Sequence, residues 1–155
     1  MVMIYIITET GTGLGKLIHR ISEENEMQRF DYNDAFDHMS DFNKEGAVTL
    51  LEYKAAGDHS TEFADVANAL LNYRVRPILL ITDLEGMDAD SLKSAALVLE
   101  NVWNDNENDS MGYQFVYYDE VNNVSFRSPE GPTEEGATEV LDAINRESEW
   151  PYLGD

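Results

Sequence analysis

A glycine-rich stretch near the start of the chain carries the clearest chemical signal. Gly11, Gly13 and Gly15 occur within five residues and are followed directly by Lys16. Glycine lets the backbone turn tightly and approach a ligand without a Cβ clash, and the free N–H groups at the start of a helix attract anions. A lysine in a first helical turn opposes the helix dipole by about 0.3–1 kcal/mol unless an anion lies nearby. The stretch therefore predicts a loop that binds an anion such as phosphate.

Two acidic residues follow a second apolar run. The segment from Pro77 to Asp83 is apolar until its last two residues, which is typical of a buried strand, and Glu85 comes shortly after it. In open α/β sheets, ligands bind beyond the carboxyl ends of the strands. Because the glycine-rich stretch also follows an apolar strand, we expect both segments to lie at one edge of the same sheet.

The remaining periodic segments place these two loops in an alternation of strands and helices. Strands are predicted at 2–8, 47–53, 77–83, 112–118 and 124–126, helices at 14–27, 61–74, 89–103 and 133–150, and a short helix or irregular segment at 32–42. The last two strands form a hairpin across Asn122 and Asn123. The pattern predicts a three-layer α/β sandwich with a mostly parallel sheet and an antiparallel hairpin near one edge. Residues 1–150 are expected to form a single α/β domain and 151–155 a loose C-terminal tail.

These motifs resemble those of P-loop NTPases, whose phosphate-binding loop has a glycine, four variable residues, and then Gly-Lys-Ser/Thr. Gly15 and Lys16 match the central pair, and Thr10 stands at the position of the first glycine. The loop is similar to the helicase-type variant, which keeps a glycine where this sequence has Gly13. The apolar strand that ends at Asp83 looks like the second signature of the family.

The resemblance implies a site for ATP or GTP with Mg²⁺. It assigns cofactor binding to Gly11, Thr12, Gly13, Gly15 and Lys16. It also implies that Asp83 organises a metal ion or water and that Glu85 acts as a catalytic base. Leu17 stands where the family has a metal-binding hydroxyl, so nucleotide or phosphate binding is expected with weak or absent hydrolysis. The residues alone leave another interpretation open, in which the glycines form only a tight turn between a strand and a helix.

The charge of the chain points to a different class of function. The sequence holds 31 acidic residues against 10 lysines and arginines, and residues 81–155 contain 18 of those acids but 3 of those bases. Binding to duplex DNA or to an anionic membrane depends on lysine and arginine, so neither is expected. The alternative is an acidic interaction protein without a cofactor, such as a phage-type inhibitor that mimics the charge of DNA or a virion assembly component. Its partner would be a basic protein. Solubility and adaptation to high salt also explain such acidity.

The rest of the composition limits the class of protein. The chain has no cysteine, which excludes disulfides and cysteine-bound metals. No apolar run approaches the roughly 20 residues of a membrane span, and the first run is too short and lacks the basic flank of a signal peptide. We therefore expect a cytoplasmic protein, located in the host cytoplasm or in the virion if it is viral.

Overall fold

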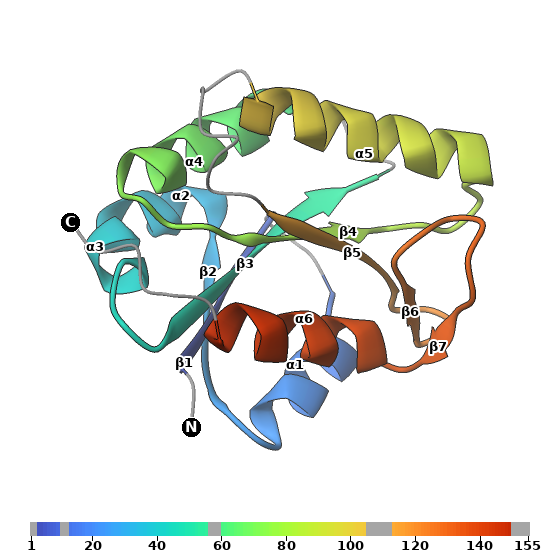
Figure 1. Ribbon diagram of the computed structural model, residues 1–155, viewed down its shortest axis with the longest axis horizontal. Helices are drawn as coiled ribbons and strands as arrows, with labels where there is room; N and C mark the ends of the chain where they lie inside the picture. The colour runs from blue at the N-terminus through green and yellow to red at the C-terminus, as the bar shows by residue number, and fades with distance from the viewer. Residues whose placement is uncertain (1–2, 10–12, 56–59, 105–112, 150–155) are drawn as a thin grey trace.

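A seven-stranded sheet forms the centre of the computed structural model, which describes residues 3–9, 13–55, 60–104 and 113–149 (Figure 1). The strands lie in the order β2-β1-β3-β4-β5-β6-β7. Five of them run parallel: β1 (Met3–Thr8), β2 (Glu26–Asp31), β3 (Ala47–Lys54), β4 (Ile78–Thr82) and β5 (Gln114–Asp119). The last two, β6 (Val124–Phe126) and β7 (Glu134–Glu135), extend the sheet antiparallel at one edge. The predicted mostly parallel sheet with a hairpin near one edge is confirmed.

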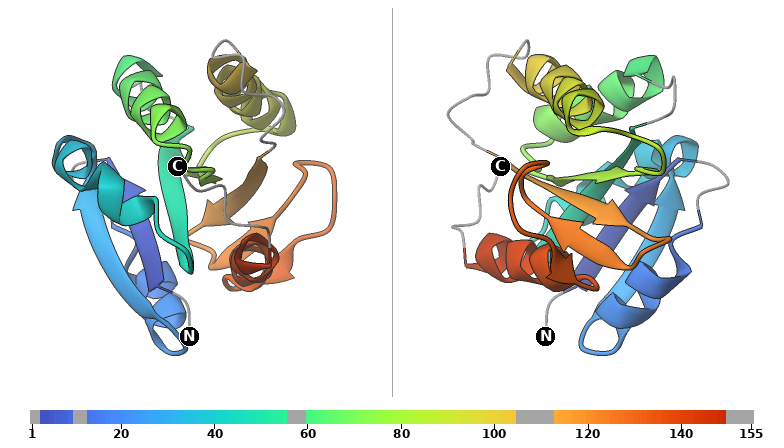
Figure 2. Two further views of the ribbon diagram at one scale, coloured as in Figure 1. Left: turned by 60° about the vertical axis from the view of Figure 1, so that its left-hand side comes forward. Right: turned by 90° about the vertical axis from the view of Figure 1, so that its right-hand side faces the viewer.

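Helices cover both faces of this sheet (Figures 1 and 2). α1 (Gly15–Ser22) and α6 (Thr138–Ser148) pack on one face. The other face carries α2 (Tyr32–Ala35), the 3₁₀ turn η1 (Phe36–His38), α3 (Met39–Phe42), α4 (Ser60–Asn72) and α5 (Ala89–Asn104). This is the predicted three-layer sandwich. Of the helices in the described ranges, none is both long and apolar enough to cross a membrane.

The alternation of side chains along the strands divides the core into two layers. On β1, Ile4 and Ile6 belong to the layer under α1 and α6, whereas Tyr5 and Ile7 belong to the layer under α2–α5. Full burial of a side chain of this size stabilises the fold by about 1.5–3 kcal/mol. Because β1 is packed on both faces, its carboxyl end is firmly positioned, and α1 begins a few residues beyond it.

The predicted helix at 14–27 is wrong in its second half. α1 ends at Ser22, and Glu26–Asp31 forms strand β2 at the edge of the sheet. Phe30 is the single buried residue of β2, so this strand lacks the apolar run that identifies the central strands. An edge strand pairs on one side only and tolerates such a polar sequence.

The predicted helix at 133–150 begins later than expected. Glu134 and Glu135 form β7, which pairs with β6, and α6 starts at Thr138. Gly136 separates the two elements with a φ of 60°, a left-handed conformation that glycine adopts without strain. The expected tail at 151–155 lies outside the described residues.

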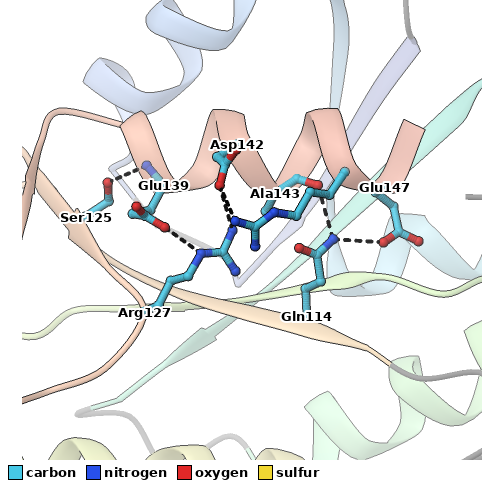
Figure 3. A network of polar contacts seen from close by, with 8 residues as sticks. Gln114, Ser125, Arg127, Glu139, Asp142, Ala143 and Glu147 are labelled. Atoms are coloured by element: carbon cyan, nitrogen blue, oxygen red, sulfur yellow. Dashed lines mark hydrogen bonds and ion pairs between the residues drawn. The ribbon is translucent and has the colours of Figure 1, made fainter. Parts of the chain in front are cut away.

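Polar contacts fix α6 against the sheet (Figure 3). At the start of the helix, Ser125 Oγ accepts a hydrogen bond from the N–H of Glu139 (3.0 Å), and Arg127 Nε donates to the Glu139 carboxylate. Near its end, Gln114 Nε2 donates to Glu147 Oε2 (3.1 Å). Strands β5 and β6 thus hold both ends of α6, which in turn positions the surface that α6 shares with α1.

A buried ion pair adds a third attachment. Arg76, in the segment between α4 and β4, donates from Nε to Glu147 Oε1 at 2.7 Å, and each side chain is only 7% exposed. The pair joins the segment that leads into β4 to the last turns of α6.

Candidate functional site

The N-terminus of α1 holds an acidic residue from a distant part of the chain. The helix starts at Gly15 after Leu14, and no side chain of the N-cap residue bonds its first turn. The backbone N–H of Lys16 donates to Glu120 Oε1 (2.7 Å), and Lys16 Nζ donates to the Glu120 carbonyl oxygen (3.1 Å). The helix start that the sequence marks as an anion site therefore carries a carboxylate, which the chain itself supplies.

The described glycines of the loop leave the backbone open. Gly13 and Gly15 are exposed, and a Cβ added at either position would meet no atom within 4 Å. Packing within the chain does not require glycine at these two positions, whereas close approach of a ligand to the backbone would use it. Gly11 and Thr12, which were also predicted to bind a cofactor, lie outside the described residues.

The turn between β5 and β6 brings Glu120 to this helix start. Asp119 accepts hydrogen bonds from the N–H (3.1 Å) and from Nδ2 (2.7 Å) of Asn122, which closes the turn. Burial raises the pKa of the Tyr118 hydroxyl, and its side-chain interaction with the Glu120 carboxylate raises it further; in the geometry observed, the hydroxyl donates to Asn123 Oδ1 (3.0 Å). Glu120 Oε2 is buried and has no donor among the described residues. Lys16 therefore satisfies one carboxylate oxygen, and the other stays without a hydrogen bond.

Asp83 and Glu85 lie at the carboxyl edge of the sheet, where the sequence places them. Both are exposed, and with Gly13 they line a cavity of about 200 Å³. The complete lining is Gly13, Leu14, Lys54, Thr82, Asp83, Leu84, Glu85, Asp119, Glu120 and Val121. Four carboxylates face one ammonium group in this lining, so the cavity is electronegative and disfavours an unassisted phosphate. We call it the acidic cavity.

Lys16 lines a different cavity, of about 480 Å³, between α1 and the start of α6. His19 and Arg20 of α1 lie beside it, residues 136–138 contribute the start of α6, and two glutamates are also among the lining residues. The N-terminal end of a helix is positive, and no side chain of its N-cap residue, Ala137, bonds the first turn of α6. We call this the basic cavity. Lys16 thus lines one cavity and the two predicted acids line the other, and Lys16 contacts Glu120 of the acidic cavity.

The residues present do not fit a resident Mg²⁺ ion. Leu17 is 0% exposed and packs in the core beneath α1, so the position after Lys16 offers no metal ligand. In the described part of the chain, no three His, Cys, Asp or Glu side chains are grouped so that they could hold a metal ion. The roles of Asp83 as a metal ligand and of Glu85 as a base stay predictions.

Two buried glutamates join the carboxyl ends of neighbouring strands. Glu9 (5% exposed) follows β1, and Glu52 (0% exposed) lies in β3. Glu52 accepts from the N–H of Glu9 (3.0 Å) and from Thr82 Oγ1 (2.6 Å), and Glu9 Oε2 accepts from the N–H of Lys54 (2.7 Å). Tyr32 donates its hydroxyl to the Glu52 carbonyl oxygen, and burial, followed by the charges of both glutamates, raises the pKa of Tyr32.

Sequence reasoning missed these glutamates, although one signal was present. Glu52 interrupts the apolar run 47–53, and a charged residue within a strand buried on both faces needs partners. Their position is informative, because the strand order reverses between β1 and β3 and ligands of doubly wound sheets bind at such a point. At this place, the carboxylates of Glu9 and Glu52 accept hydrogen bonds that link the ends of β1, β3 and β4.

Comparison with known proteins supports the fold. No protein-family model matches the sequence, and no curated protein resembles it in sequence. Among solved structures, the chain is similar to a probable GTP-binding protein, EngB, with a TM-score of 0.62 and 10% identity over 95% of this chain and 98% of that one. It is also similar to FixJ-N, with a TM-score of 0.52 and 12% identity over 97% of this chain and 96% of that one. At such low identity, these likenesses show a shared α/β architecture and no more.

Proposed function

We propose that the chain binds a phosphate-bearing ligand, a nucleotide being the first candidate, at the N-terminus of α1 without hydrolysing it. The contact between Lys16 and Glu120 is the observation that supports this most directly, because the Lys16 amide donates to the Glu120 carboxylate and the ammonium group donates to the backbone carbonyl oxygen of the same residue. A phosphate oxygen accepts the same charge-assisted hydrogen bonds as a carboxylate oxygen. One similar structure is named a probable GTP-binding protein, which makes nucleotides the first ligands to test.

The phosphate would lie on the side of the basic cavity. Lys16, His19 and Arg20 all line it. His19 and Arg20 also approach acids one helical turn away, at 4.0 and 3.6 Å, but these pairs are largely exposed and contribute little. The lining balances Lys16 and Arg20 against two glutamates, so in a chain with a net charge of −21 it is less negative than the surface as a whole, and two helix N-termini beside it favour an anion.

The separation of the two cavities supports binding without turnover. Asp83 and Glu85, the predicted metal ligand and base, line the acidic cavity, whereas Lys16 lines the basic one. A general base must come within hydrogen-bond reach of the proton that it removes. With Leu17 buried in the core, the chain also lacks the hydroxyl that holds Mg²⁺ in P-loop NTPases.

Thermal unfolding with ligand tests the proposal. ATP, GTP and inorganic pyrophosphate, each with and without Mg²⁺, are expected to raise the Tm, since a ligand at 100 times its Kd contributes about 2.7 kcal/mol. Lys16→Ala should remove most of the shift because it deletes the ammonium group. Lys44→Ala is the matched control, since Lys44 is also an exposed lysine but pairs with Asp41 on the opposite face of the sheet. Unchanged melting with every ligand at millimolar concentration, or equal shifts in the two variants, would contradict the proposal.

A second candidate function is the docking of a basic protein partner. The three basic residues of 81–155 are all paired with acids of that same segment: Lys93 with Glu130 (2.6 Å), Arg146 with Asp142 (2.7 Å), and Arg127 with Glu139. The other acidic residues of 81–155 therefore have no lysine or arginine from the same segment left to form an ion pair with. The test is binding of a lysine-rich peptide at 50 and 300 mM NaCl, where affinity should fall steeply with salt. Glu134→Lys should weaken it further; absent or salt-independent binding rejects this function.

A further inference from the structure

The contact between Lys16 and Glu120 joins two segments that are far apart in the sequence. The residues are separated by 104 positions, and both hydrogen bonds end on Glu120. The carboxylate oxygen at 2.7 Å from the Lys16 amide occupies a place that an oxygen of a bound phosphate would need. A ligand at this helix start therefore has to compete with Glu120.

The hydrogen bonding of Glu120 is incomplete. Its second carboxylate oxygen is buried without a well-aligned donor among the described residues; the Tyr118 hydroxyl interacts with this carboxylate but donates its proton to Asn123. A buried acceptor without a partner is unfavourable, and this penalty offsets part of the stabilisation that the contact with Lys16 provides. Release of the side chain into solvent would remove this penalty.

The turn that carries Glu120 is held by few contacts with the rest of the protein. Val121, next in the chain, is 64% exposed, and the two hydrogen bonds of Asp119 stay within the turn. Asn123 is better anchored, since its carbonyl oxygen accepts from the N–H of Gly136 (2.7 Å). Residues 120–122 lie outside the β5–β6 pairing, whose last pair is Asp119 with Val124, and can therefore move without breaking it.

We infer that Glu120 is an internal competitor for the proposed phosphate site, and that the ligand binds only when the β5–β6 turn withdraws this carboxylate from Lys16. The inference rests on the proposed function and adds the regulation of that site. The closed form lowers the apparent affinity, which equals the intrinsic affinity multiplied by the fraction of molecules in which Lys16 is free of Glu120. Any partner that holds the turn away from α1 would increase ligand affinity.

The test compares affinities for ATP, GTP and inorganic pyrophosphate by isothermal titration calorimetry in a graded series. Glu120→Gln keeps a neutral acceptor for the Lys16 amide, whereas Glu120→Ala removes the acceptor. We expect affinity to rise about 10- to 100-fold in Glu120→Ala, the range for loss of a charge-assisted hydrogen bond, and less in Glu120→Gln. Glu85→Gln removes the same charge from the lining of the cavity that Glu120 also lines, and it leaves both the turn and the Lys16 contacts in place, so it measures the purely electrostatic part of the effect.

The outcomes separate this inference from the proposed function. Tighter binding in the order Ala, Gln, wild type supports both. Equal affinity in wild type and both Glu120 variants overturns the competition and leaves the phosphate site standing. No binding by any of the proteins, with circular dichroism showing that the variants are folded, overturns the site and the inference together. An effect of Glu85→Gln as large as that of Glu120→Ala also overturns the competition, because general charge would then explain it.

Discussion

The buried ion pair between Arg76 and Glu147 makes a sharp prediction about stability. Arg76→Met keeps much of the aliphatic length of the side chain and removes its charge. Glu147, at 7% exposure, would then keep the neutral donor Gln114 on one carboxylate oxygen and lose the guanidinium on the other. The variant therefore tests what it costs to leave a carboxylate buried without its cation.

The expected magnitude follows from distance and burial. At 2.7 Å, the attraction between two unit charges is about 6 kcal/mol with an effective dielectric constant of 20. Desolvation offsets part of this, and loss of one partner from a buried pair typically costs about 3–5 kcal/mol. Because Gln114 still donates to Glu147, we expect about 3 kcal/mol, which is a fall in Tm of roughly 6–12 °C for a chain of this size.

Urea denaturation followed by circular dichroism measures the effect as a shift in the midpoint at constant slope. Arg146→Met is the matched control, since Arg146 also pairs at 2.7 Å with an acid of α6 but both side chains are about half exposed (52% and 45%). Its expected cost is below about 1 kcal/mol. In the double variant Arg76→Met/Glu147→Met, an apolar pair replaces the ion pair, and most of the lost stability should return. A loss under about 1 kcal/mol for Arg76→Met, or a double variant as unstable as the sum of the single ones, would refute the reasoning.

Three further predictions concern the core, the backbone and alkaline pH. Leu17→Thr should destabilise the fold by about 2–4 kcal/mol without making its melting depend on Mg²⁺, because residue 17 is fully buried; thermal scans with and without MgCl₂ check this. Asp83 has a φ of 60°, so Asp83→Val should cost about 1–2 kcal/mol in urea unfolding, whereas Asp83→Gly should stay within about 0.5 kcal/mol. Burial raises the pKa of Tyr32 and Tyr118 in the folded state. Their contribution to the free energy of unfolding is complete below the unfolded tyrosine pKa of about 10 and is lost as the pH rises from there towards the folded pKa. The fraction of unfolded protein and the tyrosinate absorbance should therefore increase together above about pH 10.

Much of the fold follows from local sequence pattern. The apolar runs at 47–53 and 77–83 are β3 and β4, and the amphipathic segment at 89–103 is α5. β2 could not be predicted in this way, because an edge strand with a single buried phenylalanine shows almost no hydrophobic periodicity. β7 could not be predicted either, since two glutamates before a helix look like the acidic first turn of that helix.

The candidate site was predictable only in part. The glycines and Lys16 signal an anion at the start of α1, and Asp83 and Glu85 reach the expected edge of the sheet. The identity of the acceptor could not be predicted, because Glu120 meets Lys16 only after β5 has paired with β4 and the following turn has folded. The contact of the Lys16 ammonium group with the β5–β6 turn likewise depends on packing between elements that are distant in sequence.

The two outermost strands have a consequence for how molecules of this protein meet one another. β2 presents exposed Glu26, Gln28 and Arg29 along a six-residue edge, and β7 is only two residues long. Intermolecular strand pairing needs a long, flat and uncharged edge, and charged or very short edge strands discourage it. Neither border of the described sheet meets that need, so the β-rich core is protected against growth into sheets shared between molecules.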